Sequence, residues 1–175
     1  MDLLITANDV TTYCRVSSNI PSAQMTRFIR EAQIFDVIPL LGWDLTNALL
    51  NDLNTSPPLQ TERFSLLYNG GEYENNSGDK YYLHGIKMFH AYCTYKRLLD
   101  ENSVNLTAFG VVQKIDELSQ PLTDVQMAMI TNKVNEKVMA LRDNVYNFLC
   151  MKSADYNEWK NYQIKNYRKI KVIGD

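Results

Sequence analysis

The fold is decided by residues 5–50, which read ITANDVTTYCRVSSNIPSAQMTRFIREAQIFDVIPLLGWDLTNALL. Thr6 followed by Asp9 is typical of a helix N-cap and predicts a short helix through about Cys14. A second helix is predicted to begin near Pro21, because the first helical turn does not need the N–H that proline lacks. Its apolar residues recur at intervals of three and four and are predicted to form one buried stripe, which comprises Met25, Phe28, Ile29, Ala32 and Phe35.

Proline and glycine shape the end of this stretch. Pro39 disfavours helical geometry at Ile38 and cannot donate to the preceding turn, so we expect the helix to break or kink there. Gly42 is free to reverse the chain. A further helix is then expected over about 43–53, and a shorter one over about 59–68 after a proline-containing loop.

A long helix is predicted at the centre of the fold. The stretch 69–78 is rich in Gly, Asn and Ser, which predicts the most exposed and mobile connection of the body. We expect a helix from about Asp79 to Glu101, because its apolar residues cover nearly half of the helix circumference. Gly85 lies inside that arc, where the missing side chain would let a second backbone come close.

An extended arm and a second long helix are predicted next. Residues 104–115 contain Phe, Val and Ile around a glycine, which indicates an extended arm or a short strand. Thr123 with Gln126 three residues later is typical of a capping box and predicts a helix start. The stripe of this helix is the strongest helical pattern in the sequence and comprises Met127, Ile130, Val134, Val138, Leu141, Val145, Phe148 and Leu149.

Together these elements predict an all-α protein, a single-domain helical bundle of about five to six helices with an extended arm and an extended C-terminal tail. A chain of 175 residues, 45% of them hydrophobic, suffices to bury roughly 70% of the surface of its unfolded form. We expect a helical domain at residues 1–159 and a basic tail at 160–175. The tail carries five basic residues and one acidic residue, so the formal net charge of −2 divides into +4 on the tail and −6 on the body.

No residue pattern indicates catalysis. His84 and His90 are six residues apart on one predicted helix, which places them on different faces, unlike the i, i+4 pair of a zinc helix. No serine or cysteine lies in a recognisable catalytic motif, and no pair of carboxylates stands out. We therefore expect no enzyme activity, no metal site and no cofactor. The three cysteines, Cys14, Cys93 and Cys150, lack a CxxC pair and are expected to be reduced in apolar surroundings.

The N-terminal sequence indicates where the protein is made. MDLLITAND has no basic segment and too short an apolar run for a signal peptide, and no stretch approaches the ~20 apolar residues that span a bilayer. We expect the protein to be made and to remain in the cytoplasm, without a membrane partner.

Two features of the sequence leave alternatives open. The tyrosines between Tyr81 and Tyr95 suit a core whose hydroxyl groups reach the surface, or a contact between identical subunits. Lys96 falls in the same arc and favours an interface or a salt-bridged edge. The tail is a solvated terminus, a segment that binds nucleic acid through phosphates and stacking, or an arm that pairs with a neighbouring protein.

The order of these elements resembles a known family. A short capped helix, a turn, an amphipathic helix ending at Pro39-Leu40-Leu41-Gly42, the extended FGVV and then SQPLTD before a long helix are similar to small helical head-to-tail connector (adaptor) proteins of tailed phages. The resemblance is to connectors of phages that infect Bacteroidetes, including the crAss-like group, and runs from about Ile5 to Leu149.

The resemblance implies a structural virion protein. Such connectors form a ring, commonly of twelve subunits, that docks on the portal, links it to the tail or to further ring proteins, and helps retain packaged DNA. DNA would pass through the lumen without sequence-specific binding. The resemblance places the protein at the portal vertex, or neck, of the virion, after assembly in the host cytoplasm.

The resemblance also implies which residues make contacts. The predicted portal-docking residues are in the tail and comprise Lys165, Arg168, Lys169, Ile170, Lys171 and Val172. The predicted contacts between subunits come from the arm and from the end of the body and comprise Phe109, Val111, Val112, Tyr156 and Trp159. The alternative is a small helical nucleic-acid-binding protein, for packaging or regulation, that uses the basic tail on DNA.

Overall fold

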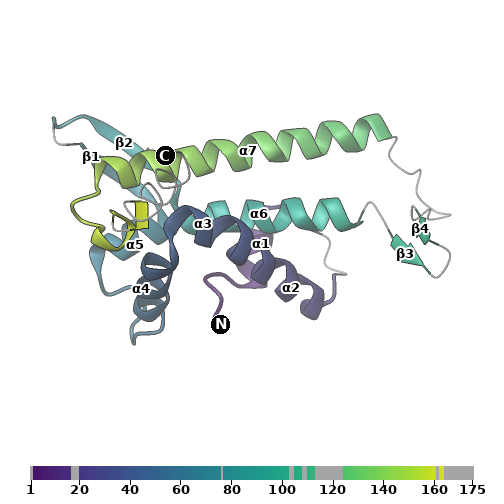
Figure 1. The fold of residues 1–175 in the computed structure, drawn as a ribbon, viewed down its shortest axis with the longest axis horizontal. Helices are drawn as coiled ribbons and strands as arrows, with labels where there is room; N and C mark the ends of the chain where they lie inside the picture. Colours follow the sequence, from purple (N-terminus) through teal and green to yellow (C-terminus); the bar gives the residue numbers. More distant parts are fainter. Residues whose placement is uncertain are drawn as a thin grey trace, which may run out of the picture.

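The computed structural model describes residues 2–16, 20–75, 77–102, 105–107, 110–112, 124–160 and 162–163. These residues are mostly helical, with two short two-stranded antiparallel sheets, so the predicted all-α class is confirmed at that level (Figure 1). In chain order the elements are α1 (Ala7–Tyr13), α2 (Ser22–Ala32), η1 (Gln33–Val37), α3 (Ile38–Leu41), α4 (Trp43–Leu53), α5 (Glu62–Asn69), β1 (Gly71–Glu74), β2 (Lys80–Leu83), α6 (Gly85–Asn102), β3 (Asn105–Thr107), β4 (Gly110–Val112) and α7 (Asp124–Met151).

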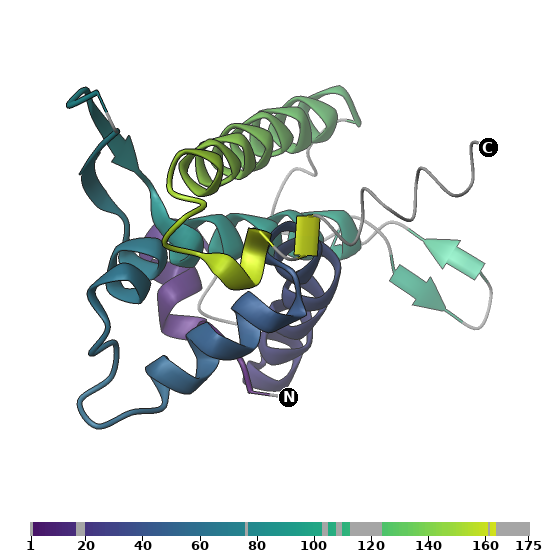
Figure 2. The same cartoon turned by 60° about the vertical axis from the view of Figure 1, so that its left-hand side comes forward.

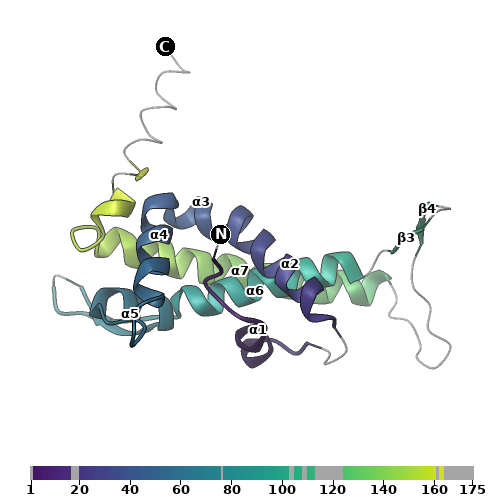
Figure 3. The same ribbon diagram turned by 90° about the horizontal axis from the view of Figure 1, so that it is seen from below.

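Helix α6 lies at the centre of the fold, as predicted. It contacts α1, α2, α5, η1 and α7 and buries an apolar face that includes Ile86, Phe89 and Cys93. Helix α7 runs antiparallel to α6 and lies alongside it (Figures 1 and 3). It packs mainly on α6, with a smaller contact to β2. Five residues of its predicted stripe are buried, which confirms the stripe at these positions: Val134, Leu141, Val145, Phe148 and Leu149.

The chain remains helical through Pro39, where a break or kink was predicted. Between α2 and α3 it forms the π-helix η1, in which the N–H of Ile38 donates to the carbonyl of Gln33, five residues earlier. A π-turn holds more residues than an α-turn, so the side chains after Ala32 leave the phase of the α2 stripe. Phe35, predicted to be buried with that stripe, is therefore 62% exposed, while Gln33 and Val37 are fully buried.

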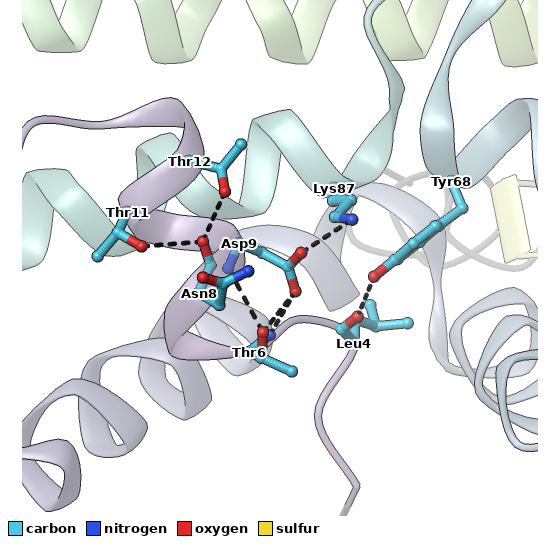
Figure 4. Close-up of polar contacts among 8 residues, drawn as sticks. All are labelled: Leu4, Thr6, Asn8, Asp9, Thr11, Thr12, Tyr68 and Lys87. Atoms are coloured by element: carbon cyan, nitrogen blue, oxygen red, sulfur yellow. Dashed lines mark hydrogen bonds and ion pairs between the residues drawn. The ribbon is translucent and has the colours of Figure 1, made fainter.

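The buried Gln33 side chain holds the N-terminal segment. Its Oε1 accepts from the N–H of Leu4 at 2.8 Å, and its Nε2 donates to the carbonyl of Asp2 at 2.8 Å. The Leu4 carbonyl in turn accepts from the hydroxyl of Tyr68 at 2.7 Å (Figure 4). A buried polar group needs a partner, and these bonds supply it. They hold segment 2–5 against η1 and α5, which are far apart in sequence.

The predicted cap of α1 is confirmed. Thr6 and Asp9 form a capping box, and Asp9 also pairs with Lys87 of α6 at 2.8 Å (Figure 4). Partial burial alone would raise the pKa of Asp9, but hydrogen bonds from Lys87 and Thr6 outweigh it and hold that pKa below its usual value. The cap therefore stabilises the N-terminus of α1 and also joins α1 to the central helix.

The segment predicted as a loop and a helix start forms a β-hairpin instead. Strands β1 and β2 pair with Tyr73 opposite Tyr81, and α6 begins at Gly85 rather than near Asp79. The prediction was wrong because Tyr81 and Tyr82 fit a helical stripe and a strand equally well. The predicted arm at 104–115 contains strands β3 and β4, which pair with each other.

Gly85 permits the close backbone approach that was predicted, although it lies at the start of α6. Its φ is +83°, and a Cβ added there would lie 2.6 Å from the backbone N of Gly70 and 2.6 Å from the carbonyl O of Tyr68. Gly78 has a similar φ of +86° but open space around it. The two glycines therefore share a positive φ that would strain any other residue, and they differ only in crowding.

Substitution of these two glycines should separate the two effects. We expect Gly78→Ala to cost about 1–3 kcal/mol of unfolding free energy through positive φ alone. Gly85→Ala should cost roughly 1–3 kcal/mol more, because backbone atoms must move to admit the methyl group. Urea unfolding followed by circular dichroism measures both. Equal losses in the two variants would contradict the close approach at Gly85.

Candidate functional site

Most of the predicted docking residues lie outside the described residues. This holds for Phe109 and for the whole predicted portal-docking set, which comprises Lys165, Arg168, Lys169, Ile170, Lys171 and Val172. Val111 and Val112 lie in β4, where their backbones pair with Leu106 and Asn105 of β3.

Tyr156 and Trp159, predicted to contact a second subunit, lie in the core of their own chain. They are 1% and 4% exposed. The Tyr156 hydroxyl donates to the carbonyl of Arg63 at 2.7 Å, and the Trp159 indole N–H donates to the carbonyl of Leu40 at 3.0 Å. Their side chains offer almost no surface to a neighbour, because the turn after α7 folds back over the body.

The body extends past the predicted boundary at residue 159. The Tyr162 hydroxyl donates to the carbonyl of Pro39 at 3.1 Å. Its ring lies so close to Gly42 that a Cβ there would come within 2.6 Å of the Tyr162 Cγ. Arg63 also pairs with Glu158 at 2.8 Å and donates to the carbonyl of Asp155. Tyr162 is thus part of the packed body.

The two histidines have different surroundings, and neither joins a cluster of metal ligands among the described residues. His84 is exposed, whereas His90 is fully buried with its Nε2 at 2.9 Å from the Ile29 carbonyl. A carbonyl only accepts, so Nε2 carries the proton, while Nδ1 has no hydrogen-bond partner among the described residues. Burial outweighs the bond to Ile29 and lowers the pKa of His90 to about 4.

Two of the three cysteines are buried, as predicted. Burial raises the pKa of the Cys14 thiol to about 11 and also raises that of Cys93, which makes both poor nucleophiles. Cys150 is exposed on α7, so the prediction of apolar surroundings was wrong for this residue.

The described residues form neither a metal-binding cluster nor a membrane-spanning helix. Those residues contain no group of three or more His, Cys, Asp or Glu side chains that could hold a metal ion. None of the helices formed by the described residues is both long and apolar enough to cross a membrane.

The most distinctive surface is a groove of about 420 Å³ between η1–α3, α6 and α7. We call it the Phe35–Met139 groove after the two exposed apolar side chains that line it, which are 62% and 51% exposed. Its other lining residues mix apolar and charged groups and comprise Asp36, Pro39, Leu40, Phe89, Cys93, Lys96, Arg97, Asp100, Asn135, Val138 and Arg142. Exposed apolar residues that gather in one place are typical of an interaction site.

A salt bridge shapes the rim of this groove. Arg97 pairs with Asp36 at 2.8 Å and lies 5.3 Å from the centre of the Phe35 ring. The Arg97 guanidinium therefore holds the exposed Phe35 ring in a defined place. A ring that is already ordered loses little side-chain entropy when a partner binds. Lys96, which the sequence marked as unsuited to a sealed core, is half-buried in the same groove.

A second groove of about 380 Å³ lies along α6 and α7. It is lined by His84, Met88, Tyr92, Lys137, Ala140, Leu141 and Asn144. The two grooves share no lining residue, so α7 presents unlike surfaces to its surroundings.

The β1–β2 hairpin is a third exposed feature. Its outer face, which comprises Glu72, Glu74, Lys80 and Tyr82, is exposed, and Tyr82 is 58% exposed. Asn144 of α7 holds its base, since Oδ1 accepts from the N–H of His84 and Nδ2 donates to the carbonyl of Tyr82, both at 2.9 Å.

The sequence missed Phe35, Met139 and the hairpin as candidate interaction residues. Phe35 was assigned to the core because its spacing fits an α-helical stripe, and no local pattern reveals the π-turn. The one available signal was Lys96, a charged residue within an apolar arc.

Comparison with known proteins gives one family match. The model of a family described as a family of unknown function, DUF6712, matches residues 37–169. No curated protein and no solved structure matches the chain. The matched range begins next to α3 and includes the hairpin, α6 and α7, so both grooves lie largely within it.

The buried imidazole should make stability depend on pH. The unfolded chain binds a proton at His90 below about pH 6.5, whereas the folded chain does not until about pH 4. Protons therefore favour the unfolded chain in that window, and the unfolding free energy should fall by roughly 3 kcal/mol as the pH drops through it.

Denaturant unfolding at a series of pH values measures this slope. We expect His90→Gln, whose amide can still donate to Ile29, to flatten the decline between pH 6.5 and 4.5. His84→Gln is the matched control, because it removes an exposed imidazole, and it should keep the wild-type slope. A wild-type slope in His90→Gln would contradict a buried neutral His90.

Proposed function

From the premise that the chain belongs to DUF6712, a family of unknown function, we propose that it is a structural subunit that assembles with copies of itself and with other virion proteins. In this proposal it is a head-to-tail connector that forms a ring, docks on the portal, links the portal to the tail or to further ring proteins, and helps retain packaged DNA. Its function is mechanical, and it needs no substrate or cofactor.

The open flanks of α7 carry the proposal. This helix has 28 residues, a length of ~42 Å, and it packs mainly on α6. On its flanks lie the Phe35–Met139 groove and the second groove, which differ in their residues. A ring of identical subunits requires that one surface of a copy fit a different surface of the next. Unlike flanks on one long, rigid helix meet that requirement.

The C-terminal tail supplies the arm in this proposal. Tyr162 packs beside Pro39 and Gly42, and residues 164–175 lie outside the described residues. Twelve residues span at most about 40 Å when extended. Their basic and β-branched residues, among them Lys165, Arg168 and Ile170, suit an acidic, strand-edged acceptor on the portal.

The charge of the body agrees with a DNA conduit. Residues 1–159 carry a formal net charge of −6. A negative lumen would repel the phosphates and let DNA slide without adhering. An assembled ring whose lumen is lined with lysine and arginine would contradict this part of the proposal.

Removal of the tail should weaken attachment to the portal. The deletion should cover residues 164–175 rather than 160–175, because Tyr162 packs on Gly42 and its loss would disturb the body. We expect the truncated chain to keep its circular dichroism spectrum and to lose most of its occupancy on portal particles imaged by electron microscopy. The matched control replaces residues 164–175 with a Gly-Ser segment of equal length, and it should fail in the same way. Undiminished occupancy of either variant would reject the tail as the docking arm.

DNA binding separates the proposal from its rival. A nucleic-acid-binding protein that used the tail would lose affinity steeply with salt, with a slope of about −0.9 in log–log form for each phosphate contact. We expect no salt-sensitive binding to a 30-base-pair duplex at about 0.15 M salt. Binding with a steep slope that disappears on deletion of residues 164–175 would favour the rival function.

A further inference from the structure

We propose that the outer face of the β1–β2 hairpin of one copy docks in the Phe35–Met139 groove of the next copy. The inference rests on the proposed function, since it names the contact by which the subunits would assemble. The occupant is thus a second copy of this chain, and the contact is head-to-tail.

The hairpin is held in place before it binds. Tyr73 packs edge-on against Phe148 of α7 with ring centres 4.8 Å apart, and Tyr81 stacks on Tyr73 at 5.6 Å. Asn144 holds the hairpin base through its two hydrogen bonds. At the turn, the Asn75 side chain accepts from the N–H groups of Ser77 and Asp79. A rigid element loses little conformational entropy on binding, which favours a role as the inserted part.

The alternation of the strands separates a packed face from a free one. Tyr73, Tyr81 and Leu83 belong to the face that meets the body, whereas Glu72 and Tyr82 are partners on the opposite face. Figure 2 shows the hairpin projecting from the body at the end where α7 finishes. The projecting face thus combines an exposed aromatic ring with carboxylates, and tyrosine is among the residues enriched in interface cores.

Charge favours the Phe35–Met139 groove as the acceptor. Residues 71–83 contain three acidic residues and one basic residue, a net of −2. The groove lining contains Asp36 and Asp100 against Lys96, Arg97 and Arg142, a net of +1. Opposite charges across an interface steer encounter and fix the register. The apolar Phe35 and Met139 side chains would receive the Tyr82 ring between these charges.

The second groove is the weaker acceptor because the hairpin of the same chain adjoins it. His84 and Asn144, which line it, also hold the hairpin base. A second hairpin entering there would meet the first. By contrast, no lining residue of the Phe35–Met139 groove lies in β1 or β2.

The positions of the two surfaces produce a directional assembly. The hairpin packs on the C-terminal part of α7, at Asn144 and Phe148, while the groove uses the earlier segment from Asn135 to Arg142. Each copy therefore donates at one place and accepts at another, so the contact can repeat from one copy to the next. Repeated contacts of this kind close into a ring when the rotation per copy divides the circle.

Disulfide cross-linking tests the contact directly. The background variant is Cys150→Ser, since Cys150 is exposed while Cys14 and Cys93 are buried. In that background, Tyr82→Cys on one chain and Met139→Cys on another should form a mixed disulfide dimer under oxidation at up to about 1 mM protein. A chain that carries both substitutions should form a ladder of oligomers on a non-reducing gel.

The matched control moves one cysteine out of the groove. Lys133 is exposed on α7 and is not among the groove residues, so Tyr82→Cys mixed with Lys133→Cys should not form the mixed dimer above background. Absence of the ladder from the double-cysteine chain would overturn the inference. Equal cross-linking of the Lys133 control, or of Tyr82→Cys alone, would also overturn it.

A charge exchange gives an independent measurement. Glu74→Arg and Arg142→Glu should each weaken self-association at least about tenfold in sedimentation analysis, and their combination in one chain should restore most of it. Asp143→Arg and Lys133→Glu, exposed on α7 outside the groove, are the charge-matched controls and should have little effect. Failure of the combined variant to recover would overturn the hairpin–groove contact.

The outcomes for the contact and for the proposed function are distinguishable. A cross-linked ladder from a protein that never attaches to a portal particle would support the contact and reject the connector function. Attachment to the portal without cross-linking through Tyr82 and Met139 would support the function and reject the contact.

Discussion

The structure depends on one packing constraint: α7 is joined to the rest of the chain chiefly through a single apolar stripe of its own that packs on α6. Val134, Leu141, Val145 and Phe148 fill that seam and are buried. One apolar stripe covers only part of the circumference of an α-helix. Along the 28 residues of α7, the remaining sides must therefore face solvent or a partner. Met139 and Tyr146, which are 51% and 44% exposed, lie outside the seam. The packing on α6 that stabilises α7 therefore also leaves the flanks of α7 free to contact a partner.

Residues 155–159, which follow α7 and which we call the C-terminal strap, hold the end of α7 against the body. Trp159 bonds to the carbonyl of Leu40, Tyr156 to that of Arg63, and Arg63 to Glu158, so the strap links the end of α7 to α3 and α5. These contacts are buried or half-buried, where a hydrogen bond to a charged group contributes more than it does in water. Tyr156 and Trp159, which the sequence suggested for a neighbour, thus stabilise the subunit itself. A contact between copies has to use other side chains.

Sequence patterns predicted the helices well and the surfaces poorly, for physical reasons. Helix periodicity and the Thr6 cap reflect local interactions, so α1, α2, α4 and α7 could be located from spacing alone. The β1–β2 hairpin could not, because residues 79–84 also complete a helical stripe, and only tertiary contacts to Asn144 and Phe148 favour the strand. Burial at Trp159 was likewise undecidable, since an aromatic residue near a chain end suits a core and an interface equally.

The π-helix η1 links the stability of the subunit to its capacity to bind. The phase change after Ala32 turns Gln33 inward, where it holds the backbone of Leu4, and turns Phe35 outward onto the groove rim. A regular α-helix would bury Phe35 with the stripe of α2 and remove the exposed ring beside Arg97. Such π-turns are rare and occur frequently at functional sites, because they sacrifice regular hydrogen bonding for a changed side-chain direction. Here one irregularity supplies both the anchor for the N-terminal segment and the apolar rim that a second copy would contact.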